Sequence, residues 1–145
     1  MTHHAGTIAS LDSLQWQPSP IEPSWILAGQ PQARSAPHSG SADGGSSTNT
    51  WDCTAGAFRW TFFWDETVLI LEGSVRVTSP GGQTSVLKTG DVAHFPAGTT
   101  WRWEVDEYVR KLAFHHRPAP RSLLVRIVRK LRALVSPAGV AAAQS

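Results

Sequence analysis

Gly90-Asp-Val-Ala-His-Phe-Pro-Ala-Gly-Thr-Thr-Trp-Arg-Trp-Glu-Val105 is the stretch of the sequence that decides the fold. It contains two β-prone runs, Val92 to Phe95 and Thr100 to Val105, and the turn-forming residues Pro96 and Gly98 separate them. The two runs are too short for helices of ordinary length and are rich in β-branched and aromatic residues. The stretch therefore predicts two short strands joined by a tight turn.

Short β-runs of the same kind continue on both sides, from residue 50 to residue 116. Each is bounded by glycine, proline or polar turn residues, and Pro80-Gly81-Gly82 is typical of a hairpin turn. Many short strands at this spacing predict an all-β sandwich or barrel. The predicted strands are Trp51–Thr54, Phe58–Phe63, Thr67–Leu71, Ser74–Thr78, Thr84–Leu87, Val92–Phe95, Thr100–Val105 and Tyr108–Phe114.

The N-terminal part of the chain has little periodicity. Residues 1–20 are polar, include two prolines and predict a flexible arm before a domain that spans residues 21–116. Within that domain, residues 35–49 are dense in glycine and serine, which favours a loop or mobile flap.

The C-terminal part changes to a helical period. Residues 121–135 place Leu124, Ile127, Leu131 and Leu134 on one face and most of the basic side chains elsewhere, which predicts an amphipathic basic helix. This helix either packs its leucine face on the barrel or a second subunit, or binds a membrane surface or another polyanion. Residues 136–145 are expected to be disordered.

Length and composition limit the class of protein. A chain of 145 residues with 41% hydrophobic and 17% charged residues fits one globular domain. Residues 1–116 contain 7 basic and 11 acidic side chains, a net charge of −4, whereas all six charged residues from Arg117 onward are basic. The basic balance thus belongs to the tail, so we expect no nucleic-acid binding by the core. The single cysteine, Cys53, and the absence of a signal-like or membrane-spanning apolar run predict a cytoplasmic protein.

Two blocks of the sequence resemble the cupin motifs. The spacing Gly90, Pro96, Gly98 and Trp101 resembles the second cupin motif, in which a histidine normally stands at the position of Trp101. Glu66, six residues before Gly73, resembles the glutamate of the first motif, whose two histidines would fall at Trp60 and Phe62. The resemblance implies an RmlC-like jelly-roll barrel. Over residues 22–114, the sequence is most similar to single-domain cupins related to the cupin domain of (S)-ureidoglycine aminohydrolase.

The substituted motif positions argue against a metal centre. Cupin metals are held by several nitrogen and oxygen donors, but Trp60, Phe62 and Trp101 supply none, which leaves Glu66 alone. His115 and His116 are adjacent at the end of the β-region that continues to residue 116, so in an extended chain their side chains point to opposite faces and cannot chelate together. We therefore expect no bound metal and no cofactor.

An aromatic pocket with one buried charge pair is the predicted site. A carboxylate at Glu66 needs a partner in such a setting, and Lys111 is the natural candidate for binding or for acid–base chemistry. The alternatives are that the aromatic residues only fill the core, that Lys111 is exposed and that Glu66 forms a structural hydrogen bond. The predicted lining residues are Phe58, Trp60, Phe62, Trp101 and Trp103.

The sequence thus predicts a metal-independent, homodimeric cupin that binds a small polar metabolite. Two alternatives stay open. One is an enzyme acting on a small nitrogenous metabolite through Glu66 and Lys111, and the other is an interaction protein recruited through its basic helix.

Overall fold

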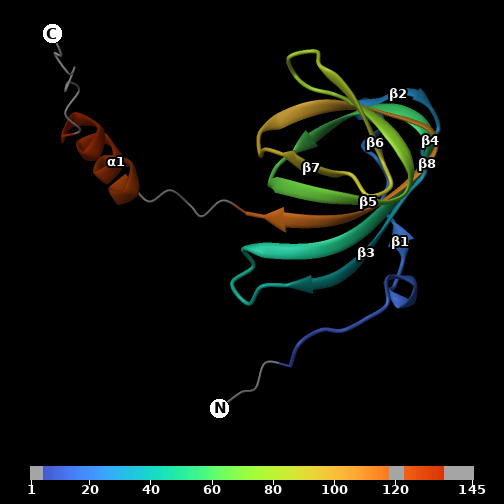
Figure 1. Cartoon of the computed structure of the whole chain (residues 1–145), viewed down its shortest axis with the longest axis horizontal. Helices are drawn as coiled ribbons and strands as arrows, with labels where there is room; N and C mark the ends of the chain where they lie inside the picture. The colour runs from blue at the N-terminus through green and yellow to red at the C-terminus, as the bar shows by residue number, and fades with distance from the viewer. Residues whose placement is uncertain (1–4, 118–122, 136–145) are drawn as a thin grey trace, which may run out of the picture.

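Three long antiparallel strands, β4 (Ser46–Phe62), β5 (Asp65–Thr78) and β8 (Thr99–His116), form the centre of the fold. In this computed structural model, which describes residues 5–117 and 123–135, β8 pairs with β4 on one side and with β5 on the other along most of its length. The sheet curls around these strands into a barrel (Figure 1).

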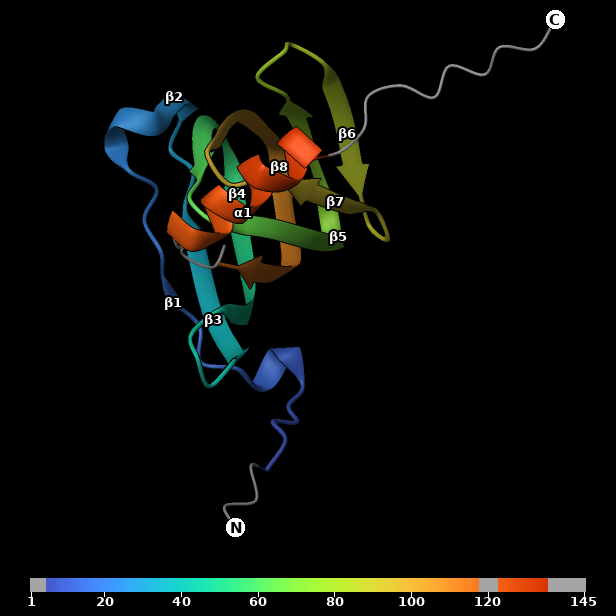
Figure 2. The same ribbon diagram turned by 90° about the vertical axis from the view of Figure 1, so that its left-hand side faces the viewer.

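Shorter strands complete the eight-stranded sheet at both edges, in the order β1-β3-β4-β8-β5-β6 with β2 on β4 and β7 on β5. Figure 2 shows β1 and β3 at one side of the barrel and β6 and β7 at the other. All pairings are antiparallel, so the predicted all-β cupin-type barrel is confirmed. The shorter strands are β1 (Gln17–Pro18), β2 (Ile26–Gly29), β3 (Ala33–Gly40), β6 (Thr84–Lys88) and β7 (Val92–Phe95).

Bulges convert several predicted pairs of short strands into single long ones. The register of β5 shifts around Gly73, and that of β4 shifts between Thr54 and Gly56, so each strand bends without ending. Gly73 has a φ of 72°, and a Cβ atom there would overlap the carbonyl group of Tyr108 on β8. A glycine is therefore required where β5 crosses from one edge partner to the other.

Aromatic side chains fill the barrel interior. Phe62 and Phe95 stack with ring centroids 4.5 Å apart, and Phe95 contacts Trp101 edge-on at 5.0 Å. Trp103 and Phe58 are almost completely buried beside them. These residues alternate along their strands with side chains that face outward, as the period of two predicts.

The expected flap at residues 35–49 is wrong, because most of this segment lies in β3 and β4. The two strands pair from Ala33 with Cys53 to Gly40 with Ser47. A short turn joins them, in which the Asp43 carboxylate accepts hydrogen bonds from the Ser41 hydroxyl and the Gly45 amide. Backbone pairing needs no particular side chain, so a composition rich in glycine and serine does not exclude strands.

The expected flexible arm is also partly wrong. A 3-10 turn, η1 (Leu11–Ser13), precedes β1, and Asp12 pairs with Arg110 of β8 at 3.0 Å. The ring of Trp16 lies between two guanidinium groups, those of Arg34 and Arg110, at 5.1 and 5.0 Å. Residues 12–18 are thus attached to the outer face of the sheet. Residues 1–4 lie outside the described part of the chain.

The C-terminal helix is a short element, α1 (Leu123–Val135). Ile127, Val128, Leu131 and Leu134 are exposed, from 49% to 81%. Within the described residues, no helix is long and apolar enough to cross a membrane. The expected helix start at residues 121–122 and the expected disorder of residues 136–145 fall outside the described residues.

Candidate functional site

Strand register brings the two predicted polar residues of the site to the same interior face. Glu66 lies near the start of β5, where it is paired with His115 of β8. Lys111 and His115 are four residues apart on β8, and an even separation along a strand puts both side chains on one face. Trp51 of β4 lies opposite Lys111 on the other side of β8. Three neighbouring strands therefore supply one cluster.

Glu66 and Lys111 form a buried ion pair. The Lys111 Nζ donates to Glu66 Oε1 at 2.5 Å, and each residue is only 5% exposed. The ammonium also lies 4.9 Å from the ring of Trp51 and 4.8 Å from that of Trp103. Indole faces attract cations, so these two rings replace part of the water that the ammonium loses on burial.

His115 extends this ion pair into a hydrogen-bonded chain. Its Nε2 lies 3.1 Å from Glu66 Oε2, and its Nδ1 lies 3.2 Å from the amide nitrogen of Asn49 and 3.5 Å from the Ser47 hydroxyl. An amide NH2 group can only donate, so Nδ1 is the acceptor and the Nε2 hydrogen points to Glu66. These hydrogen bonds thus fix the orientation of the His115 ring between Glu66 and Asn49.

Glu66 is held in its charged form. Burial by itself would raise the pKa of this carboxyl, but the nearby Lys111 ammonium and hydrogen bonds from His115 and Lys111 outweigh it and lower the pKa to about 2. Both carboxylate oxygens have partners, which satisfies the buried charge.

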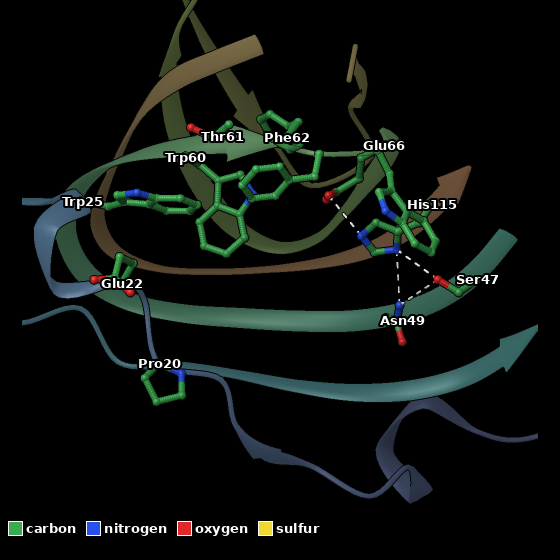
Figure 3. A pocket seen from close by; sticks show the side chains of 12 residues that line it. Pro20, Glu22, Trp25, Ser47, Asn49, Trp60, Thr61, Phe62, Glu66 and His115 are labelled. Carbon is green, nitrogen blue, oxygen red and sulfur yellow. Dashed lines mark hydrogen bonds and ion pairs between the residues drawn. The ribbon is translucent and has the colours of Figure 1, made fainter. Parts of the chain in front are cut away.

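Two adjoining cavities meet at this cluster. A cavity of about 530 Å³ is bordered by Glu66, His115 and the rings of Trp25 and Trp60 (Figure 3), and a smaller one of about 260 Å³ reaches Lys111 and Trp51. Asn49, Trp60, Glu66 and His115 border both. A volume of this size suits a small metabolite.

Two of the five predicted lining residues border a cavity. Trp60 and Phe62 border the larger cavity, as expected for a pocket wall. Phe58 and Trp103, by contrast, are 0% and 1% exposed and belong to the packed core. Trp101 borders neither cavity, and its indole nitrogen donates to the Thr99 hydroxyl at 3.0 Å. For these three residues the core-filling alternative describes the structure.

Sequence reasoning missed several residues of the site. His115 was considered only as a metal ligand together with His116, yet it is hydrogen-bonded to Glu66. Its alternation with Lys111 along β8 was a usable signal, because it puts both on the interior face. Asn49 and Ser47 lie in the segment expected to be a flap, and Trp25 lies in η2 (Pro23–Trp25). None of the three belonged to a predicted strand, so strand alternation could not place them at the cavity.

The donor set does not fit a metal centre of the cupin type. Trp60, Phe62 and Trp101 carry no ligand atoms at the matched motif positions, and both oxygens of Glu66 are taken by Lys111 and His115. Among residues 5–117 and 123–135, no three histidine, cysteine, aspartate or glutamate side chains lie close enough together to hold a metal ion. An ammonium at the carboxylate would repel a cation.

Two further buried polar residues, Cys53 and Asp52, lie away from both cavities and have a structural role. Burial raises the pKa of the Cys53 thiol to about 12, so it stays protonated and unreactive. Asp52, on the outer side of β4, accepts hydrogen bonds from Arg34 and, at 2.9 Å, from the Tyr108 hydroxyl. Burial and this hydrogen bond raise the pKa of Tyr108 to about 12. This group attaches β3 to β8 across β4.

Comparisons with solved structures give cupin-type neighbours. The ethanolamine utilization protein EutQ of Salmonella typhimurium LT2 is 26% identical, with a TM-score of 0.53 over 59% of this chain and 69% of that one. A DUF861-family protein of unknown function from Pseudomonas syringae pv. tomato is 25% identical, with a TM-score of 0.65 over 71% of this chain and 45% of that one. This chain thus spans a little under half of the Pseudomonas protein.

More distant matches support the fold alone. The EutQ protein of Clostridium difficile is 15% identical, with a TM-score of 0.53 over 64% of this chain and 68% of that one. The comparison with curated proteins gave no match. The family model described as the EutQ-like cupin domain matches residues 40–113, about half of the chain and nearly all of the three long strands. This chain belongs to the EutQ-like cupin domain family.

Proposed function

We propose that this protein is a metal-independent cupin that binds a small polar metabolite in the larger cavity of its barrel. The observation that carries the proposal is the buried chain Lys111–Glu66–His115 at the cavity wall. A charge network that only stabilised the fold would gain little from burial, because desolvation offsets most of the attraction between the charges. A network beside a cavity of about 530 Å³ is placed to recognise a ligand.

The chemistry of the wall supports a polar ligand with an apolar body. Trp25 and Trp60 provide aromatic contact area, whereas Ser47, Asn49 and His115 provide hydrogen-bonding groups at the cavity. A few polar groups on a mostly apolar wall are typical of metabolite pockets, in which they fix the orientation of the ligand. Similarity to the cupin domain of (S)-ureidoglycine aminohydrolase belongs to this proposal, and it suggests a nitrogenous compound.

A second candidate is an enzyme acting on such a compound, and the state of His115 favours it. The Nδ1 of His115 is an acceptor, so a ligand that displaces Asn49 can give it a proton. The imidazolium so formed would keep its Nε2 hydrogen on Glu66, whose carboxylate stabilises the positive charge. Glu66 and Lys111 then act through His115 and hold it in position.

Ligand screening on matched variants tests the proposal. A panel of amino acids, amines, ureides and carboxylates is measured by thermal shift and tryptophan fluorescence on the wild type, Trp60→Phe and Glu66→Gln. The control is Trp101→Phe, which changes an indole outside both cavities. We expect a metabolite that binds the wild type and the control but binds Trp60→Phe and Glu66→Gln much more weakly. Equal binding by all four proteins, or a loss only in the control, would contradict the proposal.

A further inference from the structure

Most of the indole rings in this molecule already contact a cation of the chain. Trp16 lies against Arg34 and Arg110, Trp51 and Trp103 lie against Lys111, and Trp64 lies 4.7 Å from the Arg117 guanidinium. Of the seven tryptophans in the chain, three remain, and Trp101 borders neither cavity. The remaining two, Trp25 and Trp60, face the larger cavity together.

These two rings form one corner of the cavity. Their centroids are 5.5 Å apart with an interplanar angle of 76°, so the two rings meet edge to face. Trp60 comes from β4, and Trp25 ends η2, which leads directly into β2 beside β4. Two indoles from neighbouring elements at this angle provide a concave aromatic surface, which is how proteins bind ammonium groups.

A carboxylate stands at the same end of the cavity. Glu22 caps η2, and the amide of Trp25 donates to the Glu22 carbonyl oxygen at 2.8 Å. Glu22 precedes the turn and Trp25 ends it, and both residues border the larger cavity. Figure 3 shows Glu22, Trp25 and Trp60 at one end and the Asn49–His115 group at the other.

The charge of this corner is not balanced within the described residues. Glu66 is neutralised by Lys111, but within the described residues the Glu22 carboxylate accepts one hydrogen bond, from the Ser24 hydroxyl at 3.4 Å, and forms no ion pair. Glu22 and Glu66 are the only charged acidic or basic residues bordering the larger cavity. Its net charge is therefore negative at the Glu22 end.

We propose that this corner of Trp25, Trp60 and Glu22 binds the ammonium group of a small organic cation whose body extends toward Ser47, Asn49 and His115. This inference rests on the proposed function, because it names the chemical class of ligand for the same cavity. A substituted ammonium gains cation–π contact with both rings and a charge partner in Glu22. Its polar far end meets the hydrogen-bonding groups at the opposite side.

A matched set of probes isolates the role of the positive charge. Choline, its neutral carbon analogue 3,3-dimethylbutan-1-ol and the anion 3,3-dimethylbutanoate have nearly the same bulky end. Binding is measured by isothermal titration calorimetry and by the shifts of indole NMR signals. We expect choline to bind about 5- to 30-fold more tightly than the alcohol, which corresponds to the usual strength of a desolvated cation–π contact. The anion should bind most weakly.

Variants locate the binding corner. Glu22→Gln should weaken choline binding several-fold and leave the alcohol unchanged, whereas the control Glu107→Gln, which removes an exposed carboxylate of β8, should change neither. Trp25→Leu should weaken choline binding further. Because Glu22 is exposed and Trp25 is only half-buried, both variants are expected to keep the barrel folded, and thermal melting checks this.

The results separate this inference from the proposed function. Equal affinity for choline and the alcohol, or a choline affinity that Glu22→Gln does not lower, would overturn the cation site. So would the absence of choline binding at millimolar concentration. A metabolite that binds through Glu66 while choline does not would leave the proposed function in place and remove only the cation assignment. Choline binding that Glu66→Gln does not alter would keep the cation site and argue against the role proposed for Glu66.

Discussion

At the scale of single residues, the molecule depends on the pairing of one buried carboxylate with one buried ammonium. Removal of either partner leaves the other charge without compensation in the barrel interior. A double-mutant cycle with Glu66→Gln and Lys111→Met measures this directly by urea denaturation. Each single variant should lose about 3–5 kcal/mol of the free energy of unfolding, and the double variant should lose clearly less than the sum of the two. Additive losses would mean that the two side chains do not interact in solution.

The ion pair also predicts how stability depends on pH. The pKa of Glu66 is lowered to about 2 in the folded state, whereas an unfolded glutamate titrates near 4.3. The contribution of Glu66 is therefore complete above about pH 5 and is lost as the pH falls toward 2. We expect the wild type to lose about 3 kcal/mol more than Glu66→Gln between pH 6 and pH 2. Parallel pH profiles of the two proteins in chemical denaturation would contradict a depressed pKa.

Residue-level prediction from the sequence succeeded where alternation alone decides the outcome. The two-residue alternation of a β-strand put Lys111 on the interior face. A buried carboxylate at Glu66 needed a partner there, so the pair could be expected. His115 needed the register between β5 and β8, which brings it opposite Glu66 and which no local pattern specifies. Trp101 and Trp103 share the interior face, yet only packing decides that they fill the core and not the cavity wall.

At the scale of elements, the bends of β4 and β5 let each of these strands pair with two shorter edge strands, β2 and β3 for β4 and β6 and β7 for β5. Gly73→Ala tests this, because a methyl group there meets the Tyr108 carbonyl and the backbone keeps a positive φ. We expect a loss of several kcal/mol in the free energy of unfolding. The control Gly82→Ala has a φ of 89° but no atom within 4 Å of the added Cβ, so it should lose only about 1–2 kcal/mol. Similar losses in the two variants would show that the close approach of β5 to β8 is unimportant.

Elements whose ends were inferred from glycine and proline were the hardest to predict. Glycine and proline correctly marked the turns at residues 80–82 and 96–98, but they gave wrong ends inside β4 and wrong loops at residues 35–49. Gly56 stands at a bulge and not at a strand end, because the neighbouring β8 continues past it. Tertiary pairing overrode local composition at each of these sites.

At the scale of the whole molecule, the C-terminal helix carries a group of exposed apolar side chains, Ile127, Val128, Leu131 and Leu134. We propose that this face packs in a homodimer. Deletion of residues 118–145 should then lower the melting temperature and shift the protein toward a monomer in analytical ultracentrifugation. A truncated protein that melts unchanged, while the full chain binds anionic vesicles at physiological salt, would favour recruitment to a polyanionic surface.

The barrel is proposed to bind its ligand without a metal. The most direct measurement is native mass spectrometry combined with elemental analysis, on protein that has been incubated with Mn²⁺, Fe²⁺, Ni²⁺ or Zn²⁺ and then dialysed. We expect well under one equivalent of each metal and an unchanged melting temperature in chelator, because Lys111 and His115 occupy the oxygens of Glu66. One equivalent of metal retained by the wild type and lost in Glu66→Gln would contradict the account.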